Sequence, residues 1–210
     1  MEKVCFIIGA MDPGEIYLGK RENAFVMACD KGFSHLGGIK PDLVVGDFDS
    51  LGYEPEGYPV LYHVPEKDDT DTMMAVKEGF RRGFDTFVLY GCMGGRPDHE
   101  FANYQALSYM TAHGGRGYMI GGGWNITHMV GQLEIEGPVG GDFSVFAFGE
   151  RAAGVTIKGG KYPLENGTLT PYFPLGVSNS FKGENALIYC QEGGVLVMWQ
   201  GDARQLIDKL

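Results

Sequence analysis

The sequence predicts a two-part protein: an α/β unit built on a mostly parallel, doubly wound sheet, followed by a small all-β sandwich. In the first part, short apolar runs that end at glycine or aspartate alternate with stretches of helical spacing, which is typical of a parallel sheet. From about Trp124 onward the runs are short and rich in β-branched and aromatic residues, with glycine, proline or asparagine between them. We therefore expect an α/β domain over residues 1–123 and a β-sandwich domain over residues 124–210.

The strands of the first part are expected where the apolar runs lie. These runs cover residues 4–9, 24–29, 43–45, 60–64, 86–90 and 117–122. A first helix should begin near Thr70, because apolar side chains then recur at helical spacing at Met73, Val76 and Phe80. A second helix should begin at Pro97, which suits a first helical turn, and should turn Phe101 and Leu107 inward.

Composition limits the possible functions. The chain has 210 residues and is 44% hydrophobic, so it can build real cores. Its formal net charge of −10 argues against nucleic-acid binding, which needs a basic face. The four cysteines are far apart and form no C-x-x-C pair, and the first apolar run is too short for a signal peptide or a membrane span. We expect a cytoplasmic protein that binds neither nucleic acid nor a membrane.

Polar clusters follow several of the expected strands. Asp30 follows the second apolar run, the segment GDFDS follows the third, and GGRPDH follows the fifth. The segment KDDTDT lies where the first helix begins. Because ligands of open α/β sheets collect at the carboxyl ends of the strands, we expect these clusters to share one rim.

Asp47 and Asp49 are the sharpest of these signals. Residues two apart in extended chain point the same way, and two carboxylates at close range repel unless a cation lies between them. Mg²⁺ prefers such hard oxygen ligands, often together with substrate phosphates. The alternative is an ordinary turn, because G-D-x-D-S is also good turn chemistry.

KDDTDT strengthens the metal interpretation. Aspartate and threonine are preferred helix caps, but one cap residue would be enough, and this segment has three acids, Asp68, Asp69 and Asp71. GGRPDH would then present the backbone amides of a helix N-terminus to an anion, and Arg96 could take a phosphate in bidentate fashion. Asp98 and His99 are candidates to touch a substrate hydroxyl.

Taken together, these segments resemble the thiamine pyrophosphokinase family. The matching elements, in order, are ACDKG, P-D-x-x-x-G-D-F-D-S-L, K-D-x-T-D, G-x-x-G-G-R-x-D-H-x-x-x-N and a late S-N-S. The resemblance implies transfer of a diphosphoryl group from Mg-ATP to the hydroxyl of thiamine, giving thiamine diphosphate and AMP. It also implies a catalytic α/β domain that binds ATP and Mg²⁺, a thiamine-binding β-sandwich, and a homodimer.

The resemblance also implies roles for individual residues. Asp47, Asp49 and Asp71 would be the magnesium and pyrophosphate carboxylates, with Asp68 close by and Asp30 at the nucleotide end. Either Asp71 or Asp98 would accept the proton of the alcohol. The remaining contacts would come from Arg96 and Asn103 near the phosphates, and from Tyr162, Ser178 and Asn179 at thiamine.

This chain departs from the family pattern in two places. Lys31 stands where the family often has glycine, and Tyr162 stands where some members have tryptophan. Tyr162 could stack on thiamine or could simply pack in the sandwich core.

Two other functions are compatible with part of the sequence. LVVGDFDSL resembles the D-x-D motif of haloacid-dehalogenase-type phosphatases, in which the first aspartate, here Asp47, is a nucleophile. That motif usually opens the chain, whereas two strand-like runs precede it here. A non-catalytic nucleotide- or thiamine-binding protein is the other alternative, although pure binding of a polyanion would not need so many carboxylates.

Overall fold

The fold was analysed in a computed structural model, which describes residues 3–19, 24–62 and 69–210. The chain divides into two compact units. One comprises Met1–Gly122 together with Ile207–Leu210, and the other comprises Gly123–Leu206. Each unit is described by itself below.

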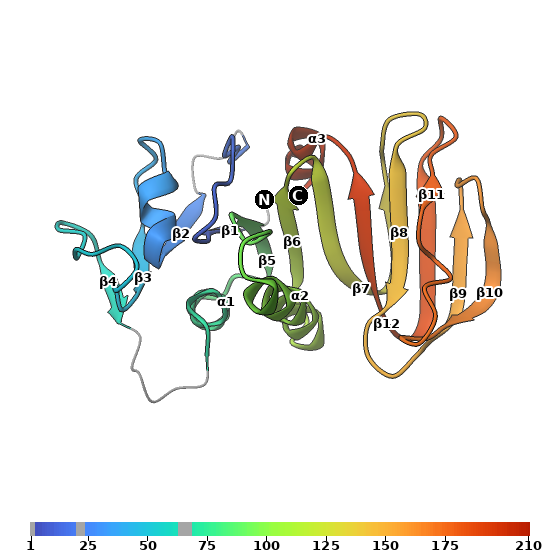
Figure 1. Ribbon diagram of the computed structural model, residues 1–210, viewed down its shortest axis with the longest axis horizontal. Helices are drawn as coiled ribbons and strands as arrows, with labels where there is room; N and C mark the ends of the chain where they lie inside the picture. Colours follow the sequence, from blue (N-terminus) through green and yellow to red (C-terminus); the bar gives the residue numbers. More distant parts are fainter. Residues whose placement is uncertain (1–2, 20–23, 63–68) are drawn as a thin grey trace. The chain divides into compact units, whose positions relative to one another are not determined.

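The first unit is built on a parallel sheet with strand order β6-β5-β1-β2-β3-β4 (Figure 1). Its strands are β1 (Val4–Ile8), β2 (Phe25–Cys29), β3 (Leu43–Gly46), β4 (Val60–Tyr62), β5 (Thr86–Tyr90) and β6 (Arg116–Gly121). Every residue of β1, β3 and β5 is buried, which explains why these strands are continuous apolar runs rather than alternating ones. The expected parallel sheet is therefore confirmed, although residues 63 and 64 of the fourth predicted strand lie outside the described residues.

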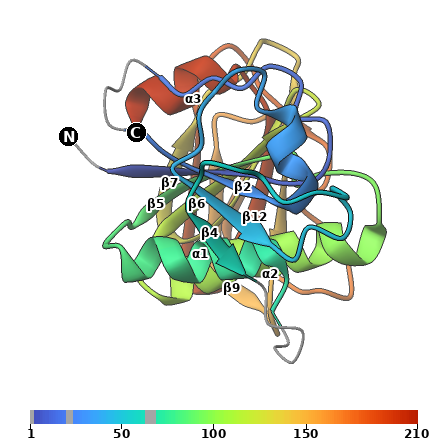
Figure 2. The ribbon, with the colours of Figure 1, turned by 90° about the vertical axis from the view of Figure 1, so that its left-hand side faces the viewer.

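Helices α1 (Asp71–Arg81) and α2 (Pro97–Ala112) confirm the two predicted helices. They lie side by side against the same face of the sheet (Figure 2). The described residues of this unit also form a 3-10 helix, η1 (Asp30–His35), directly after β2. Helices are thus fewer than a fully doubly wound fold would have, and that part of the prediction stays a prediction. The inward orientation expected for Phe101 is wrong, because its side chain is 55% exposed, whereas Leu107 is fully buried.

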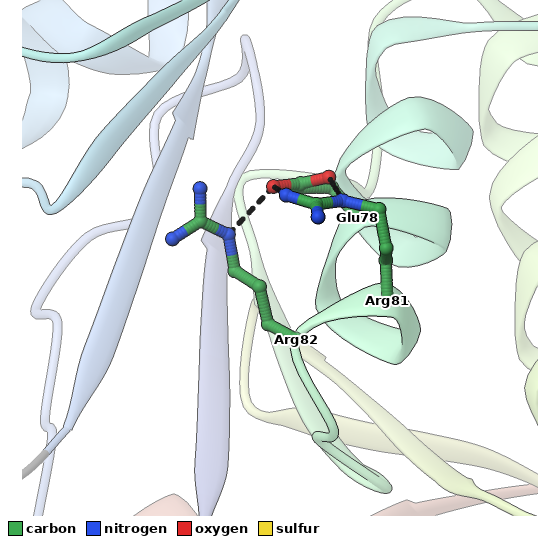
Figure 3. Close-up of polar contacts among 3 residues, drawn as sticks. All are labelled: Glu78, Arg81 and Arg82. Atoms are coloured by element: carbon green, nitrogen blue, oxygen red, sulfur yellow. Dashed lines mark hydrogen bonds and ion pairs between the residues drawn. The ribbon is translucent and has the colours of Figure 1, made fainter.

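One ion cluster lies on the last turn of α1. Glu78 is 8% exposed and accepts hydrogen bonds from the guanidinium groups of Arg81 and Arg82. Figure 3 shows both arginines reaching the one carboxylate, and the Arg82 guanidinium also lies 5.0 Å from the ring centre of Phe25. The cluster therefore fastens the end of α1 to strand β2.

The second unit consists of antiparallel strands around one long strand. They are β7 (Trp124–Ile135), β8 (Asp142–Ala147), β9 (Ala152–Lys158), β10 (Leu164–Leu169), β11 (Asn179–Ser180) and β12 (Ala186–Gln200). β7 pairs with β12 along most of its length, with an irregularity between Cys190 and Val195. The opposite edge of β12 pairs with β9 before that irregularity and with β8 after it. An all-β second part is confirmed, and its description as a sandwich stays a prediction.

The chain ends in helix α3 (Ala203–Lys209). Ile207 on this helix is fully buried, and the Asp208 carboxylate accepts a hydrogen bond of 2.8 Å from the Tyr17 hydroxyl in the first unit, to which Asp208 itself belongs. Within the described part of the chain, no helix has the length and apolar character needed to cross a membrane.

Candidate active site

A cavity of about 540 Å³ opens in the first unit, where the strands of the parallel sheet end. Its lining includes the residues that follow β1, β2, β3 and β5, together with the first turns of α1 and α2. This is the rim on which the sequence places its polar clusters, and it is the place where ligands of open α/β sheets bind. The predicted site residues that line it are Asp30, Asp47, Asp49, Asp71, Arg96, His99 and Asn103.

Three carboxylates converge in this cavity. One oxygen each from Asp30, Asp47 and Asp49 lies within 4.8 Å of the other two. Asp47 and Asp49 are exposed, whereas Asp30 is only 6% exposed. Such a set of like charges is costly unless a cation or a shared proton lies among them.

The approach of Asp30 depends on unusual backbone geometry. Asp30 has a φ of 45°, in the left-handed region that aspartate tolerates better than most residues. Gly46 has a φ of 148°, and a Cβ at this position would lie 3.2 Å from the Cβ of Asp30. Glycine at the end of β3 therefore lets Asp30 come close to the two acids that follow.

The segment after Gly46 turns its apolar and acidic side chains in opposite directions. Phe48 has a φ of 65° and is only 6% exposed, and its ring centre lies 6.1 Å from that of Tyr62. Asp47 and Asp49 on either side of it remain exposed. The buried aromatic thus anchors the turn that presents the two carboxylates.

Local hydrogen bonds satisfy some, but not all, of these oxygens. Asp47 Oδ1 accepts a bond of 3.2 Å from the Asp49 amide, and Asp49 Oδ1 accepts one of 2.9 Å from the Ser50 hydroxyl. These bonds are the turn that the alternative interpretation expects. Asp30 Oδ1, in contrast, is buried and has no hydrogen-bond partner among the described residues. A turn does not account for that atom, whereas a bound cation would.

The start of α1 adds further acidic groups to the cavity. Thr70 is the helix cap, its side chain accepting a bond of 3.2 Å from the Met73 amide. Asp69 also lines the cavity and forms an ion pair of 2.6 Å with Lys77. Asp71 lines the cavity in the first helical turn, and Asp68 lies outside the described residues.

The start of α2 contributes the cationic side of the cavity. Arg96 donates hydrogen bonds to both carboxylate oxygens of Asp98. The bond from Nε to Oδ1 is 3.1 Å long, and the bond from Nη2 to Oδ2 is 2.6 Å long. This bidentate bond lowers the pKa of Asp98 to about 2. Arg96 lines the cavity, whereas Asp98 is not among its lining residues. Asp98 is consequently a weak base placed beside the cavity, and Asp71 is the better located of the two candidate bases.

Two neighbouring residues hold this loop in shape. Asn103 is buried and donates a bond of 2.8 Å to the Cys92 carbonyl, so its amide supports the loop after β5. Glu100 accepts a bond of 3.0 Å from the Gly94 amide and lines the cavity. Glu100 is not among the residues predicted from the sequence, although an acid in the first turn of a helix that follows a glycine loop is a usable signal.

The two cysteines that line the cavity are not reactive groups. Burial raises the pKa of Cys92 to about 12, and burial also raises the pKa of Cys29. All four cysteines are buried and free.

The candidate thiamine residues lie in the second unit. Tyr162 is 58% exposed, so it does not pack in the core of this unit. Ser178 is exposed and has a φ of 57°, and its amide donates a bond of 3.1 Å to the Ser144 hydroxyl. Asn179 is only 5% exposed and is hydrogen-bonded to the backbone of Tyr162.

Comparison with known proteins identifies the family of the chain. Residues 20–118 match the model of the thiamin pyrophosphokinase catalytic domain, and residues 132–194 match the model of the thiamin pyrophosphokinase vitamin B1 binding domain. The chain is 30% identical over 169 residues to the thiamine pyrophosphokinase of Bacillus subtilis, covering 75% of this chain and 78% of that protein. The chain belongs to the thiamine pyrophosphokinase family.

Solved structures of this family share the fold. The crystal structure of the thiamine pyrophosphokinase from Bacillus subtilis matches with a TM-score of 0.82 at 24% identity, over 96% of this chain and all of that one. The thiamin pyrophosphokinase from Candida albicans matches with a TM-score of 0.77 at 15% identity, over 95% of this chain and 90% of that one. Membership in the thiamine pyrophosphokinase family gives the chain the activity of a thiamine diphosphokinase, and the phosphatase alternative is not favoured.

Proposed function

We propose that this thiamine diphosphokinase uses Mg²⁺ held by the three carboxylates of its first unit. The observation that carries the proposal is the convergence of Asp30, Asp47 and Asp49 within 4.8 Å, with the buried Oδ1 of Asp30 lacking a hydrogen-bond partner. A hard cation satisfies that oxygen and relieves the repulsion among the acids, so the residues fit the metal. When bound, the metal neutralises phosphate oxygens of ATP.

The proposed metal ligands differ from those expected from the resemblance in one respect. The sequence assigned Asp47, Asp49 and Asp71 to the metal and Asp30 to the nucleotide. The cluster in the structure is formed with Asp30, while Asp71 lines the same cavity from the start of α1. We propose Asp30, Asp47 and Asp49 as the metal-binding group and Asp71 as the base that takes the proton of the thiamine hydroxyl.

The remaining residues of the cavity bind and orient ATP. Arg96 is exposed at the cavity, and its guanidinium is the group best suited to a phosphate. Gly94 and Gly95 are exposed directly before it, with φ values of 79° and 76° that favour glycine. Asn103 keeps that loop in place through the Cys92 carbonyl.

Thiamine binding is proposed for the second unit, as a sandwich domain over residues 124–210 that follows a catalytic domain over residues 1–123. The exposed ring of Tyr162 supports a stacking role, and the exposed Ser178 hydroxyl supports a polar contact to the ligand. A homodimer is supported by large apolar side chains that are exposed between β10 and β11 at Tyr172, Phe173 and Leu175. The four free cysteines support a reducing, cytoplasmic location.

A product assay tests the proposed reaction. The purified protein is incubated with ATP, Mg²⁺ and thiamine, and the nucleotide and thiamine products are separated. We expect AMP and thiamine diphosphate in equal amounts. Formation of ADP or free phosphate in their place would contradict diphosphoryl transfer.

A binding assay tests the metal site without relying on turnover. Mn²⁺, a paramagnetic stand-in for Mg²⁺, is titrated into the protein and the free ion is followed by electron paramagnetic resonance. We expect Asp30→Asn to weaken binding by about 10-fold or more, because it removes a charged ligand. Wild-type Mn²⁺ affinity in Asp30→Asn would remove Asp30 from the site. Asp12→Asn, which alters a turn acid bonded to Gly14, is the matched control.

A further inference from the structure

The side chain of Asn179 forms three hydrogen bonds, all with the polypeptide backbone. Its Oδ1 accepts hydrogen bonds of 2.9 Å from the amides of both Tyr162 and Ser180. Its Nδ2 donates a bond of 2.7 Å to the Tyr162 carbonyl. Both backbone polar groups of Tyr162 are therefore held by one buried amide.

The neighbouring backbone continues this attachment. The Lys161 amide donates a bond of 2.9 Å to the Ser180 carbonyl, and Gly160 and Phe181 form an antiparallel bridge. A Cβ on Gly160 would lie 2.6 Å from Asn179 Oδ1, so glycine at this position makes room for the amide. Residues 160–162 are thus docked against residues 179–181.

The ring of Tyr162 gains its position from this backbone. The side chain is 58% exposed, and the Lys161 Nζ lies 5.2 Å from the centre of its ring. Because few neighbouring atoms hold the ring, its placement depends mainly on the backbone of Tyr162, which sets the direction of the Cα–Cβ bond. Hydrogen bonds that fix this backbone therefore also help to fix the position of the ring.

We propose that Asn179 is a positioning residue that orients Tyr162 for thiamine, and that it does not itself bind the pyrimidine. The inference rests on the proposed function, in which Tyr162 stacks on thiamine. The Asn179 oxygen already accepts two hydrogen bonds, one Nδ2 hydrogen is donated to the Tyr162 carbonyl, and the residue is 5% exposed, which leaves a single N–H, itself buried, for any ligand. The polar contact to thiamine from this segment then comes from Ser178, which is exposed.

A double-mutant cycle tests the proposal. Thiamine binding is measured by calorimetry for the wild type, Tyr162→Ala, Asn179→Ala and the double variant, without ATP. We expect Asn179→Ala to weaken binding about 5- to 10-fold in the wild type and less than about 2-fold when Tyr162 is already alanine. Equal losses in both backgrounds would show that Asn179 contacts thiamine directly and would overturn the proposal.

The same measurements separate this inference from the proposed function. If Tyr162→Ala binds thiamine as the wild type does, the stacking role of Tyr162 is wrong. If Tyr162→Ala binds weakly while Asn179→Ala binds normally, only the positioning role is wrong. Asn185→Ala is the control, because it removes an asparagine of the same unit that bonds Glu134.

Steady-state kinetics distinguish a role in positioning Tyr162 from a role in stability alone, because only the first changes KM for one substrate selectively. A displaced Tyr162 should raise KM for thiamine and leave KM for ATP unchanged. A fall in kcat with no change in KM for thiamine would contradict the proposal. Should Asn179→Ala fail to fold, Asn179→Asp takes its place in the cycle, because it keeps the shape and the acceptor oxygen and removes the amide donor to the Tyr162 carbonyl.

Discussion

The two ends of helix α1 carry acidic side chains in opposite circumstances. At its start, Asp71 joins a cavity in which Asp30, Asp47 and Asp49 face one another with no cation among the described residues beyond the exposed Arg96. In its last turns, Glu78 is nearly buried and has two arginines within 2.6 Å. The carboxylates of Asp30, Asp47 and Asp49 repel one another, whereas the carboxylate of Glu78 is paired with two guanidinium groups.

The difference shows how charge serves binding in one region and stability in the other. Partners supplied by the chain lower the pKa of Glu78 to about 2, chiefly through the hydrogen bonds of Arg81, against the opposing effect of burial. Under the proposed function, the acids of the first region are neutralised only when the metal binds. Replacing an acid in the first region should therefore cost activity, and replacing Glu78 should cost stability.

The largest effect is expected for Asp49→Asn. The loss of a charged oxygen at the proposed metal site should lower kcat/KM by about 10²-fold or more. Melting temperature should stay the same or rise, because repulsion with Asp47 is removed. AMP release measured over a range of ATP concentrations, together with thermal unfolding, measures both quantities. Near-wild-type turnover in a folded Asp49→Asn protein would refute the metal assignment.

Glu78→Gln should show the reverse pattern and serves as the matched control. It leaves two guanidinium groups without a carboxylate, and we expect the free energy of unfolding to fall by about 1–3 kcal/mol. Turnover of the folded protein should be unchanged. Denaturant unfolding and the AMP assay measure the two effects, and a loss of turnover without a loss of stability would remove the contrast.

The contribution of Glu78 should depend on pH in a defined window. Because its pKa falls from an ordinary 4.5 to about 2 on folding, the stabilisation is fully present above about pH 4.5. It is lost as the pH decreases from 4.5 towards 2. The difference in unfolding free energy between wild type and Glu78→Gln should be constant near neutral pH and should shrink below about pH 4.5. A difference that grows on acidification would contradict the assignment.

Arg82→Ala should have a smaller effect than Glu78→Gln. It removes one ion pair and the guanidinium that covers the Phe25 ring, together about 1 kcal/mol. Arg81 still neutralises Glu78 in this variant. Urea unfolding at neutral pH measures the change, and a loss equal to that of Glu78→Gln would mean that Arg82 alone carries the cluster.

Arg81→Ala should have the smallest effect. Its side chain is 70% exposed, so solvent screens its ion pair with Glu78, and we expect a smaller loss of unfolding free energy than for Arg82→Ala. The same unfolding experiment ranks it against Arg82→Ala. A larger loss for Arg81→Ala than for Arg82→Ala would reverse the order that exposure predicts.

The strands, the two long helices and the strand-end rim could be predicted because each depends on local pattern. Continuous apolar runs such as residues 86–90 produce buried parallel strands, and Pro97 begins a helix where its missing amide does no harm. Phe101 was misplaced because periodicity alone does not show where the neighbouring elements end.

The finer geometry of the site could not be predicted from sequence. Asp30 reaches the other acids only through its left-handed backbone and the missing side chain of Gly46, two positions far apart in the chain. The hydrogen bonds of Asn179 to the Tyr162 backbone join segments 17 residues apart. Both cases depend on tertiary contacts that leave no local signal.

Strand β12 has a consequence for how the chain is made. β7, β8 and β9 all pair with it, yet its residues 186–200 leave the ribosome only after those three strands. Until then, open strand edges are exposed to other chains. Ile207, which is fully buried in the first unit, is synthesised later still. Vectorial synthesis therefore leaves both units incomplete until residues 186–207 have emerged.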